Sequence, residues 1–280
     1  MAQGEWKNTT MLVNQAAAIL AKESPMTLRQ LFYRLVSIAA IQNTRASYQR
    51  LSSIMTKARH DERIDFADIV DRSRPEYSPN VWQNPQEYAR MVIKSYRKDY
   101  WGGQPEHVEI WVEKDAIIGS IESLTDALGV TVRVGRGFVS TTKVHEVAQI
   151  ISNTKKRFTV FYLGDHDPSG RGIESDLHER IEAYDGIKFT MRRLAIHASD
   201  IQKFHLPPLL AKESDTRTQG FLRRYQNRCV ELDALPPSEL RRRIELGVRS
   251  KLDQQEWNRA VEVEKVELES IQNFVKLWPR

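Results

Sequence analysis

The stretch Phe158-Thr-Val-Phe-Tyr-Leu-Gly-Asp-His-Asp-Pro-Ser-Gly170 decides the fold of this chain. It opens with an apolar and β-branched run, 158–163, which predicts a buried strand. Two acids, Asp165 and Asp167, follow the strand, and Pro168 then begins a turn into a helix. Open α/β sheets place their chemistry at the carboxyl ends of parallel strands, so this stretch predicts both a fold class and a site.

The two aspartates share a strand parity, so both carboxylates are expected to point the same way. Close carboxylates repel each other, and one of them keeps its proton unless a cation satisfies both. Hard oxygen ligands favour Mg²⁺, Mn²⁺ or Ca²⁺. The alternative from this pattern alone is a solvated turn in which Asp165 or Asp167 only caps the next helix.

A second predicted strand, Val108-Glu-Ile-Trp-Val-Glu113, also ends in an acid and is followed by Lys114 and helical spacing. Because the ends of parallel strands converge, Glu113 is expected to complete a three-carboxylate Mg²⁺ site with Asp165 and Asp167. Further strands are expected at 131–134 and 188–196, with helices at 144–151 and 174–183. This alternation predicts an α/β fold with a parallel, right-handed sheet.

The N-terminal region predicts three helices, at 11–22, after a Thr27 capping box, and at 44–60. The outer face of the third helix is basic, with Arg45, Arg50, Lys57 and Arg59. This pattern favours a helix-turn-helix or winged-helix DNA-binding domain, with a wing or short strand at 64–70. The alternative is an ordinary three-helix bundle with solvated arginines.

Tyr33 lies about 120° from the centre of its helix's apolar stripe, at roughly 100° per residue. It is therefore expected on the polar face, with Arg29 one turn before it. A neighbouring guanidinium stabilises phenolate and would make the tyrosine easier to deprotonate. Spacing alone, however, favours a surface tyrosine that packs partly against a neighbouring domain.

The composition is that of a globular protein, with 40% hydrophobic and 28% charged residues among 280. A net charge of +5 and a pI near 9.2 mildly favour a polyanionic partner. Cys229 is the only cysteine, which fits a reducing compartment. With neither a signal-peptide pattern nor a membrane-spanning run, the chain is expected to be cytoplasmic, without membrane contact.

The motifs Glu113-Lys-Asp, Gly135-Arg-Gly137 and Gly164-Asp-His-Asp-Pro-Ser-Gly170 resemble the Toprim domain in the DNA-cleaving subunit of topoisomerase VI and in its kin, the meiotic double-strand-break proteins. That resemblance places Glu113, Asp165 and Asp167 on the family's metal-binding acids, with Mg²⁺ as the cofactor and Mn²⁺ as a substitute.

The segment Thr27-Leu-Arg-Gln-Leu-Phe-Tyr-Arg34 resembles the same family's winged-helix motif. There Tyr33 corresponds to the DNA-cleaving tyrosine and Arg29 to the arginine that precedes it. The phrase 231–237 also resembles the family's region after Toprim. The resemblance thus implies a winged-helix domain, residues 1–104, and a Toprim Rossmann-like domain with a C-terminal helical extension, residues 105–280.

Three further basic residues are expected to contact DNA, namely Lys114, Arg136 and Lys143, although Arg136 and Lys143 could simply be exposed. The run Arg241-Arg-Arg243 is expected to be a solvated helix face. The final helix, 252–277, is expected to pack against its own sheet domain rather than to form a coiled coil.

The resemblance implies a type IIB topoisomerase-like protein that breaks double-stranded DNA through a 5′-phosphotyrosyl link. It also implies a homodimer, in which tyrosine and metal site act across the interface, and a nucleoid-associated location. Family members work with a separate ATP-binding protein; this chain has a short N-terminal extension and no ATP signature, so such a partner stays open. A water-using Toprim nuclease and a non-catalytic DNA-binding module are the alternatives.

Overall fold

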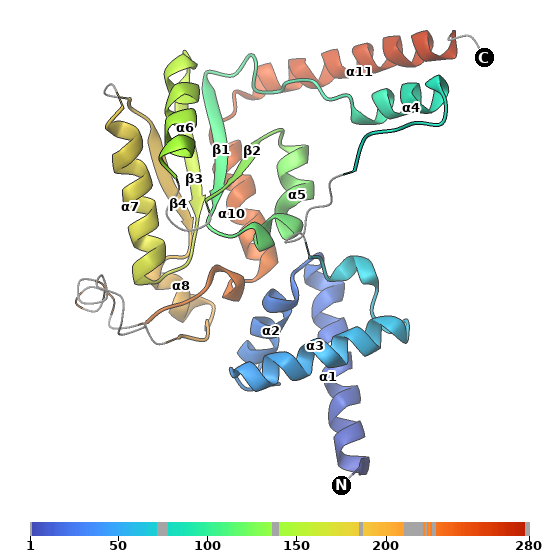
Figure 1. Ribbon diagram of the computed structural model, residues 1–280, viewed down its shortest axis with the longest axis vertical. Helices are drawn as coiled ribbons and strands as arrows, with labels where there is room; N and C mark the ends of the chain where they lie inside the picture. The colour runs from blue at the N-terminus through green and yellow to red at the C-terminus, as the bar shows by residue number, and fades with distance from the viewer. Residues whose placement is uncertain are drawn as a thin grey trace.

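The computed structural model describes residues 2–71, 78–135, 140–184, 187–209, 221, 223, 225 and 228–277, with side chains from residue 9 onward. The predicted alternation is confirmed by a four-stranded parallel sheet in the order β2-β1-β3-β4 (Figure 1). The strands are β1 (Glu106–Val112), β2 (Thr131–Val134), β3 (Arg157–Leu163) and β4 (Thr190–Ala195).

The two central strands are β1 and β3, and both are buried along almost their whole length. Such near-continuous apolar runs are typical of parallel strands covered on both faces. The chain leaves β1 toward β2 on one side and later returns to place β3 on the other side. The sheet therefore has its topological switch point between β1 and β3, where open α/β sheets bind ligands.

Helices cover both faces of the sheet (Figure 1). On one face lie α6 (Thr141–Asn153) and α7 (Pro168–Glu182), which pack on Trp111, Val160 and Tyr162. The other face is covered by η2 (Asp115–Ile117), α5 (Ile118–Ala127) and α10 (Pro237–Arg249), while α8 (Ala198–Lys203) follows β4.

The N-terminal region contains the three predicted helices, α1 (Ala2–Glu23), α2 (Leu28–Ser37) and α3 (Arg45–His60). The capping box is confirmed: the Gln30 amide donates to Thr27 Oγ1 at 3.0 Å, and the Thr27 amide donates to Gln30 Oε1 at 2.8 Å. Residues 64–70 form no named strand. They contain the short helix η1 (Phe66–Asp68) and one isolated bridge, from Ile69 to Met26.

The N-terminal helices share one apolar cluster with the sheet. The short helix η3 (Leu232–Ala234) packs directly on α2, although about 200 residues separate them in the sequence. A continuous core of this kind holds α2 against the edge of the sheet at which the predicted site lies. The division at residue 104 stays a prediction.

The final helix, α11 (Gln254–Lys276), has the predicted extent, but it does not pack on the sheet domain as expected. None of its residues is buried, and it stands off the body beside α4 (Pro85–Ser95) (Figure 1). Lys98, just after α4, holds it through a 2.7 Å ion pair with Glu267. No helix in the described part of the chain is both long enough and apolar enough to cross a lipid bilayer.

The run Arg241–Arg243 is not the solvated face that was expected. Arg241 donates to the backbone carbonyls of Glu23, Pro25 and Ser120, so it ties α10 to the α1–α2 loop and to α5. Arg243 donates to both oxygens of buried Asp200 at 2.8 and 2.7 Å. Only Arg242 is mainly solvated, with 55% of its side chain exposed.

Arg243→Ala is expected to lower the free energy of unfolding by about 3 kcal/mol, because it leaves the Asp200 carboxylate buried without its cation, with the His197 amide as its remaining donor among the described residues. Arg242→Ala is the matched control and is expected to leave stability nearly unchanged. Urea titration followed by circular dichroism measures both variants. Equal losses in the two would contradict the assigned role of Arg243.

Candidate functional site

The predicted acids gather at the switch point of the sheet. Glu113 directly follows β1, and its amide donates to the carbonyl of Leu163, the last residue of β3, at 3.0 Å. Gly164 and Asp165 then continue β3, and the Gly164 amide donates to Ala195 O at 2.9 Å. The parallel ladder therefore carries Glu113 and Asp165 to the same edge.

Glu113 and the Asp165–Asp167 turn are in direct contact. Glu113 Oε2 accepts a 2.9 Å hydrogen bond from the Asp165 amide. Asp167 caps α7, because its Oδ1 accepts from the Gly170 amide at 2.6 Å. A Cβ added at Gly170 would lie 2.9 Å from Glu113 Oε2 and 3.2 Å from Asp167 Oδ1, so the missing side chain leaves room where these carboxylates converge.

Asp165 is buried and already has strong partners. Its Oδ2 lies 2.7 Å from Lys114 Nζ, and its Oδ1 accepts from the Leu232 amide at 2.8 Å. Lys114 also lies 3.7 Å from a Glu231 oxygen and 3.8 Å from an Asp233 oxygen. One ammonium group thus lies near three carboxylates. The segment 231–233 contacts the acids of the sheet through the Leu232 amide.

The local electrostatics show an excess of negative charge. Burial, followed by the negative charges of Asp165 and Asp167, raises the pKa of Glu113 to about 7. Burial also raises the pKa of Asp233 to about 6, and its Oδ2 accepts no hydrogen bond from any residue in the described ranges. Neighbouring carboxylates that resist ionisation in this way are stabilised by a bound cation.

The three acids fit Mg²⁺ or Mn²⁺ by donor type, since both ions prefer carboxylate oxygens. The space at Gly170 and the raised pKa of Glu113 support the same conclusion. Among the described residues, no group of three His, Cys, Asp or Glu side chains is already arranged as a metal cage. The three acids do not form such a cage because Asp165 pairs with Lys114 and the Leu232 amide, and Asp167 caps α7.

Tyr33 is not on an exposed face, so the expectation from the helical wheel is wrong. Only 2% of its surface is exposed, because η3 covers the side of α2 that the periodicity marks as polar. Burial, and next the charge of Glu231, raises its pKa to about 12 although Arg29 opposes this change. In this arrangement the phenol is a poorer nucleophile than a free tyrosine.

Arg29 does lie beside Tyr33, with its Cζ atom 5.7 Å from the ring centroid. Its guanidinium is engaged by Glu231, with Nε–Oε2 and Nη2–Oε1 distances of 2.5 Å each. Glu231 stays ionised, since the hydrogen bonds from Arg29 and the charge of Lys114 lower its pKa against the effect of burial. Glu231 therefore connects the tyrosine helix to the acids of the sheet.

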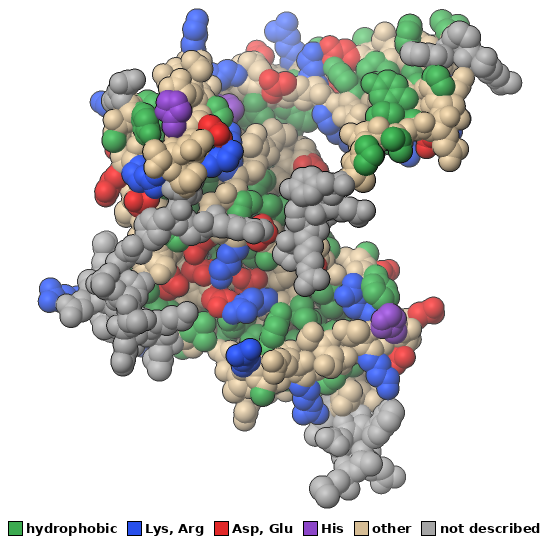
Figure 2. Space-filling model, in the orientation of Figure 1, with side chains coloured by type: hydrophobic (Ala, Val, Ile, Leu, Met, Phe, Trp, Pro, Cys, Tyr) green, Lys and Arg blue, Asp and Glu red, His purple; other side chains and the backbone are tan. Residues whose placement is uncertain are grey.

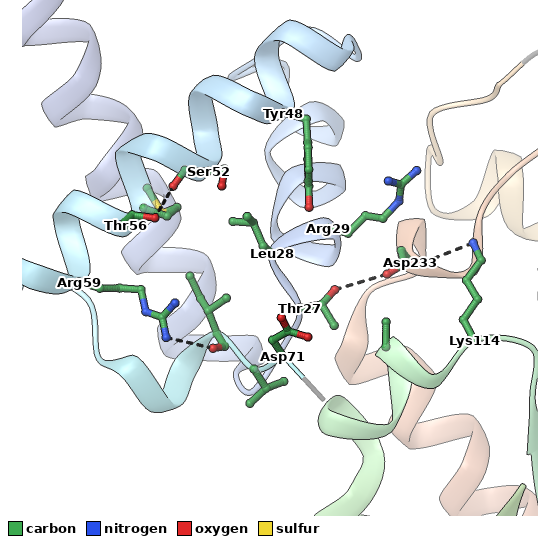
Figure 3. A pocket seen from close by; sticks show the side chains of 14 residues that line it. Thr27, Leu28, Arg29, Tyr48, Ser52, Thr56, Arg59, Asp71, Lys114 and Asp233 are labelled. Atoms are coloured by element: carbon green, nitrogen blue, oxygen red, sulfur yellow. Dashed lines mark hydrogen bonds and ion pairs between the residues drawn. The ribbon is translucent and has the colours of Figure 1, made fainter. Parts of the chain in front are cut away.

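A cleft of about 760 Å³ opens between α2, α3 and the η2–α5 turn. Figure 2 shows basic and acidic side chains gathered in the hollow between the sheet and the N-terminal helices. In Figure 3, Arg29 and Lys114 lie on the same side of the cleft with Asp233 between them, while Arg59 lies across it. Thr27, Ser52 and Thr56 add hydroxyl groups to the lining.

The other predicted DNA-binding residues are spread over the molecule. Arg45 and Lys57 are exposed on α3, and Arg50 lines a different pocket, beside α1. Lys143 is exposed on α6, where it pairs with Glu146 at 2.6 Å. Arg136 lies outside the described residues. Of the described basic residues that were predicted to bind DNA, Arg59 and Lys114 line the cleft, together with Arg29 from the predicted catalytic pair.

Sequence reasoning missed Glu231 and Asp233. Their signal was a second acid-x-acid pattern, Glu-Leu-Asp, within a phrase that was noted only for its resemblance. No local rule places this pattern beside α2 or Lys114, because the contacts depend on how the chain returns after β4.

Glu113→Gln is expected to raise the thermal midpoint by a few degrees at pH 8 and to have little effect at pH 4. The unfolded carboxyl ionises near pH 4.5, whereas the folded one holds its proton to about pH 7. The stability of the wild type therefore falls as the pH rises from about 4.5 to about 7, because the folded state binds the proton more tightly. The variant has no ionisable group at this position and does not lose this stability. Glu269→Gln, on exposed α11, is the control, and a difference independent of pH would contradict the prediction.

No family model matches the chain, and no curated protein matches it either. The resemblance to the topoisomerase VI family therefore stays a prediction that rests on the sequence motifs.

Proposed function

We propose that this protein cleaves double-stranded DNA by transesterification at Tyr33, in the manner of the DNA-cleaving subunit of topoisomerase VI. One observation carries the proposal: the segment 231–233 connects Arg29, which lies over the Tyr33 ring on α2, with Lys114 and Asp165 at the switch point of the sheet. Arg29 and Lys114 line one cleft together with Asp233, while Arg29 also contacts the Tyr33 ring and Lys114 pairs with Asp165.

In the proposed step, the Tyr33 oxygen forms a bond to a backbone phosphorus and the bond from phosphorus to the 3′-oxygen breaks. The phenol proton passes to water, and the 3′-oxygen takes up a proton. The resulting phosphotyrosyl ester preserves the bond energy, so the break can be resealed. Arg29 is placed to offset negative charge on the phosphate, and Lys114 lies next to it.

Glu113, Asp165 and Asp167 would hold Mg²⁺ or Mn²⁺. Such an ion supplies charge stabilisation at the transferring oxygens and fixes the position of the DNA backbone. Asp165 must release Lys114 for this purpose, which leaves the ammonium group available for a DNA phosphate.

We further propose a winged-helix role for residues 1–104 and a Toprim role for residues 105–280. Their partners would be double-stranded DNA, a second copy of the chain and, where strand passage occurs, a separate ATP-binding protein. A chain that acts on chromosomal DNA would work at the nucleoid.

A Mg²⁺-dependent nuclease that uses water is the second candidate, and the burial of Tyr33 favours it. Supercoiled plasmid incubated with Mg²⁺ or Mn²⁺ and quenched with detergent separates the two. Transesterification predicts linear DNA that enters the gel only after protease treatment. Linear DNA that enters equally well without protease would support hydrolysis instead.

A further inference from the structure

Two cations from distant parts of the chain bind the carboxylate of Glu231. Arg29 holds both of its oxygens, each at 2.5 Å, and Lys114 Nζ lies 3.7 Å from Oε2. A planar guanidinium recognises carboxylate and phosphate with the same fork of donors. The geometry that binds Glu231 is therefore also one that binds a phosphodiester.

This cation pair is accessible from the cleft. The Arg29 side chain is 45% exposed and that of Lys114 is 31% exposed, whereas the Glu231 side chain is 18% exposed. Both cations line the 760 Å³ cleft, and Thr27, Ser52 and Thr56 line it as well (Figure 3). A phosphate arriving through the cleft would meet both cations.

The same carboxylate lies close to Tyr33. Arg29, whose guanidinium is held by Glu231, lies over the Tyr33 ring at 5.7 Å, and burial together with the nearby charge of Glu231 raises the pKa of Tyr33. Any anion that replaces Glu231 at Arg29 is consequently held close to Tyr33, and Glu231 must leave before a phosphate can take this place.

We propose that Arg29 and Lys114 form a seat for one backbone phosphate of DNA, and that Glu231 fills this seat in the free protein until DNA displaces it. The inference rests on the proposed function, because it assigns the phosphate contact of the same site. Glu231 is tethered within the chain and competes at high effective concentration, so it weakens DNA binding and keeps a phosphate from this place close to Tyr33.

Binding is tested in a Tyr33→Phe background, where no cleavage interferes, with a fluorescent duplex at one fixed salt concentration. Glu231→Gln is expected to lower Kd about tenfold, since the phosphate no longer has to break a charge-assisted pair. Glu245→Gln is the matched control: it also loses one charge from a Glu–Arg pair, with Arg249 at 2.9 Å, on the exposed face of α10. Equal Kd values for the two variants would overturn the proposal.

Adding Arg29→Gln to the Glu231→Gln variant is expected to remove the gain in DNA affinity. If the lower Kd persists without Arg29, the proposed phosphate seat is also overturned. In protein with Tyr33 intact, Glu231→Gln should raise nitration of Tyr33 by tetranitromethane, read by mass spectrometry. Thermal unfolding verifies that each variant is folded. Tighter binding without any covalent adduct from wild type would reject the proposed function alone, whereas an adduct from wild type with unchanged binding in Glu231→Gln would reject the seat alone.

Discussion

Replacing Tyr33 with phenylalanine is expected to lower covalent attachment to DNA by at least about 10³-fold, because the bond to phosphorus is made by the lost oxygen. The substitution removes one hydroxyl and keeps the ring that packs edge-on against Phe32 at 5.3 Å. Folding should therefore survive, with a change in stability of about 1 kcal/mol or less.

Tyr48→Phe is the matched control for Tyr33→Phe. Both rings contact Phe32, and the Arg29 Cζ atom lies 5.9 Å from the Tyr48 centroid against 5.7 Å for Tyr33. Tyr48 lines the cleft without contacting Glu231 in any described interaction, so it should keep full cleavage. Detergent-trapped adduct is measured on gels, and equal losses in both variants would mean that the tyrosines act through packing alone.

Asp165→Asn is expected to reduce the rate of DNA cleavage by about 10²–10³-fold, an effect typical of losing one electrostatic contact at a reacting centre. It should also abolish the rise in thermal midpoint that Mg²⁺ gives to the wild type. The substitution keeps the size of the side chain but removes the charge that lies 2.7 Å from Lys114. Calorimetry with and without Mg²⁺ measures metal binding separately from activity.

Asp126→Asn, at an exposed position on α5, is the control for Asp165→Asn and should keep both properties. A variant at position 165 that retains the Mg²⁺-dependent stabilisation would show that the metal binds elsewhere. One that loses stabilisation by Mg²⁺ but keeps cleavage would remove the metal from the proposed chemistry.

Much of the α/β architecture could be predicted from the sequence because its signals are local. Apolar runs of strand length ending at 112 and 163 appear as β1 and β3, and the capping box at Thr27 begins α2 as expected. Acids placed just after two neighbouring parallel strands necessarily meet at one edge, so the juxtaposition of Glu113 with Asp165 followed from topology.

The environment of Tyr33 could not be predicted in this way. A helical wheel identifies the face that packs on neighbouring helices. It contains no information about a distant segment, here the one that begins at residue 231, which packs on another face of the helix. The pKa prediction failed for the same reason. Arg29 was expected to favour phenolate, whereas burial and the charge of Glu231 dominate.

The arginine run 241–243 carries the same lesson. Charge density predicts solvent exposure in general, but a long guanidinium can satisfy buried carbonyls and carboxylates that only the tertiary fold brings near. Arg241 and Arg243 do this, while Arg242 behaves as expected.

If Tyr33 becomes bonded to DNA, the residue that carries the nucleotide can be identified directly. Detergent-quenched adduct is digested with nuclease and trypsin, and the peptide carrying Tyr33 is analysed by mass spectrometry. We expect a nucleotide joined to the Tyr33 oxygen through its 5′-phosphate. Cleaved DNA with free ends, an unmodified Tyr33 peptide and undiminished cleavage by Tyr33→Phe would contradict this expectation.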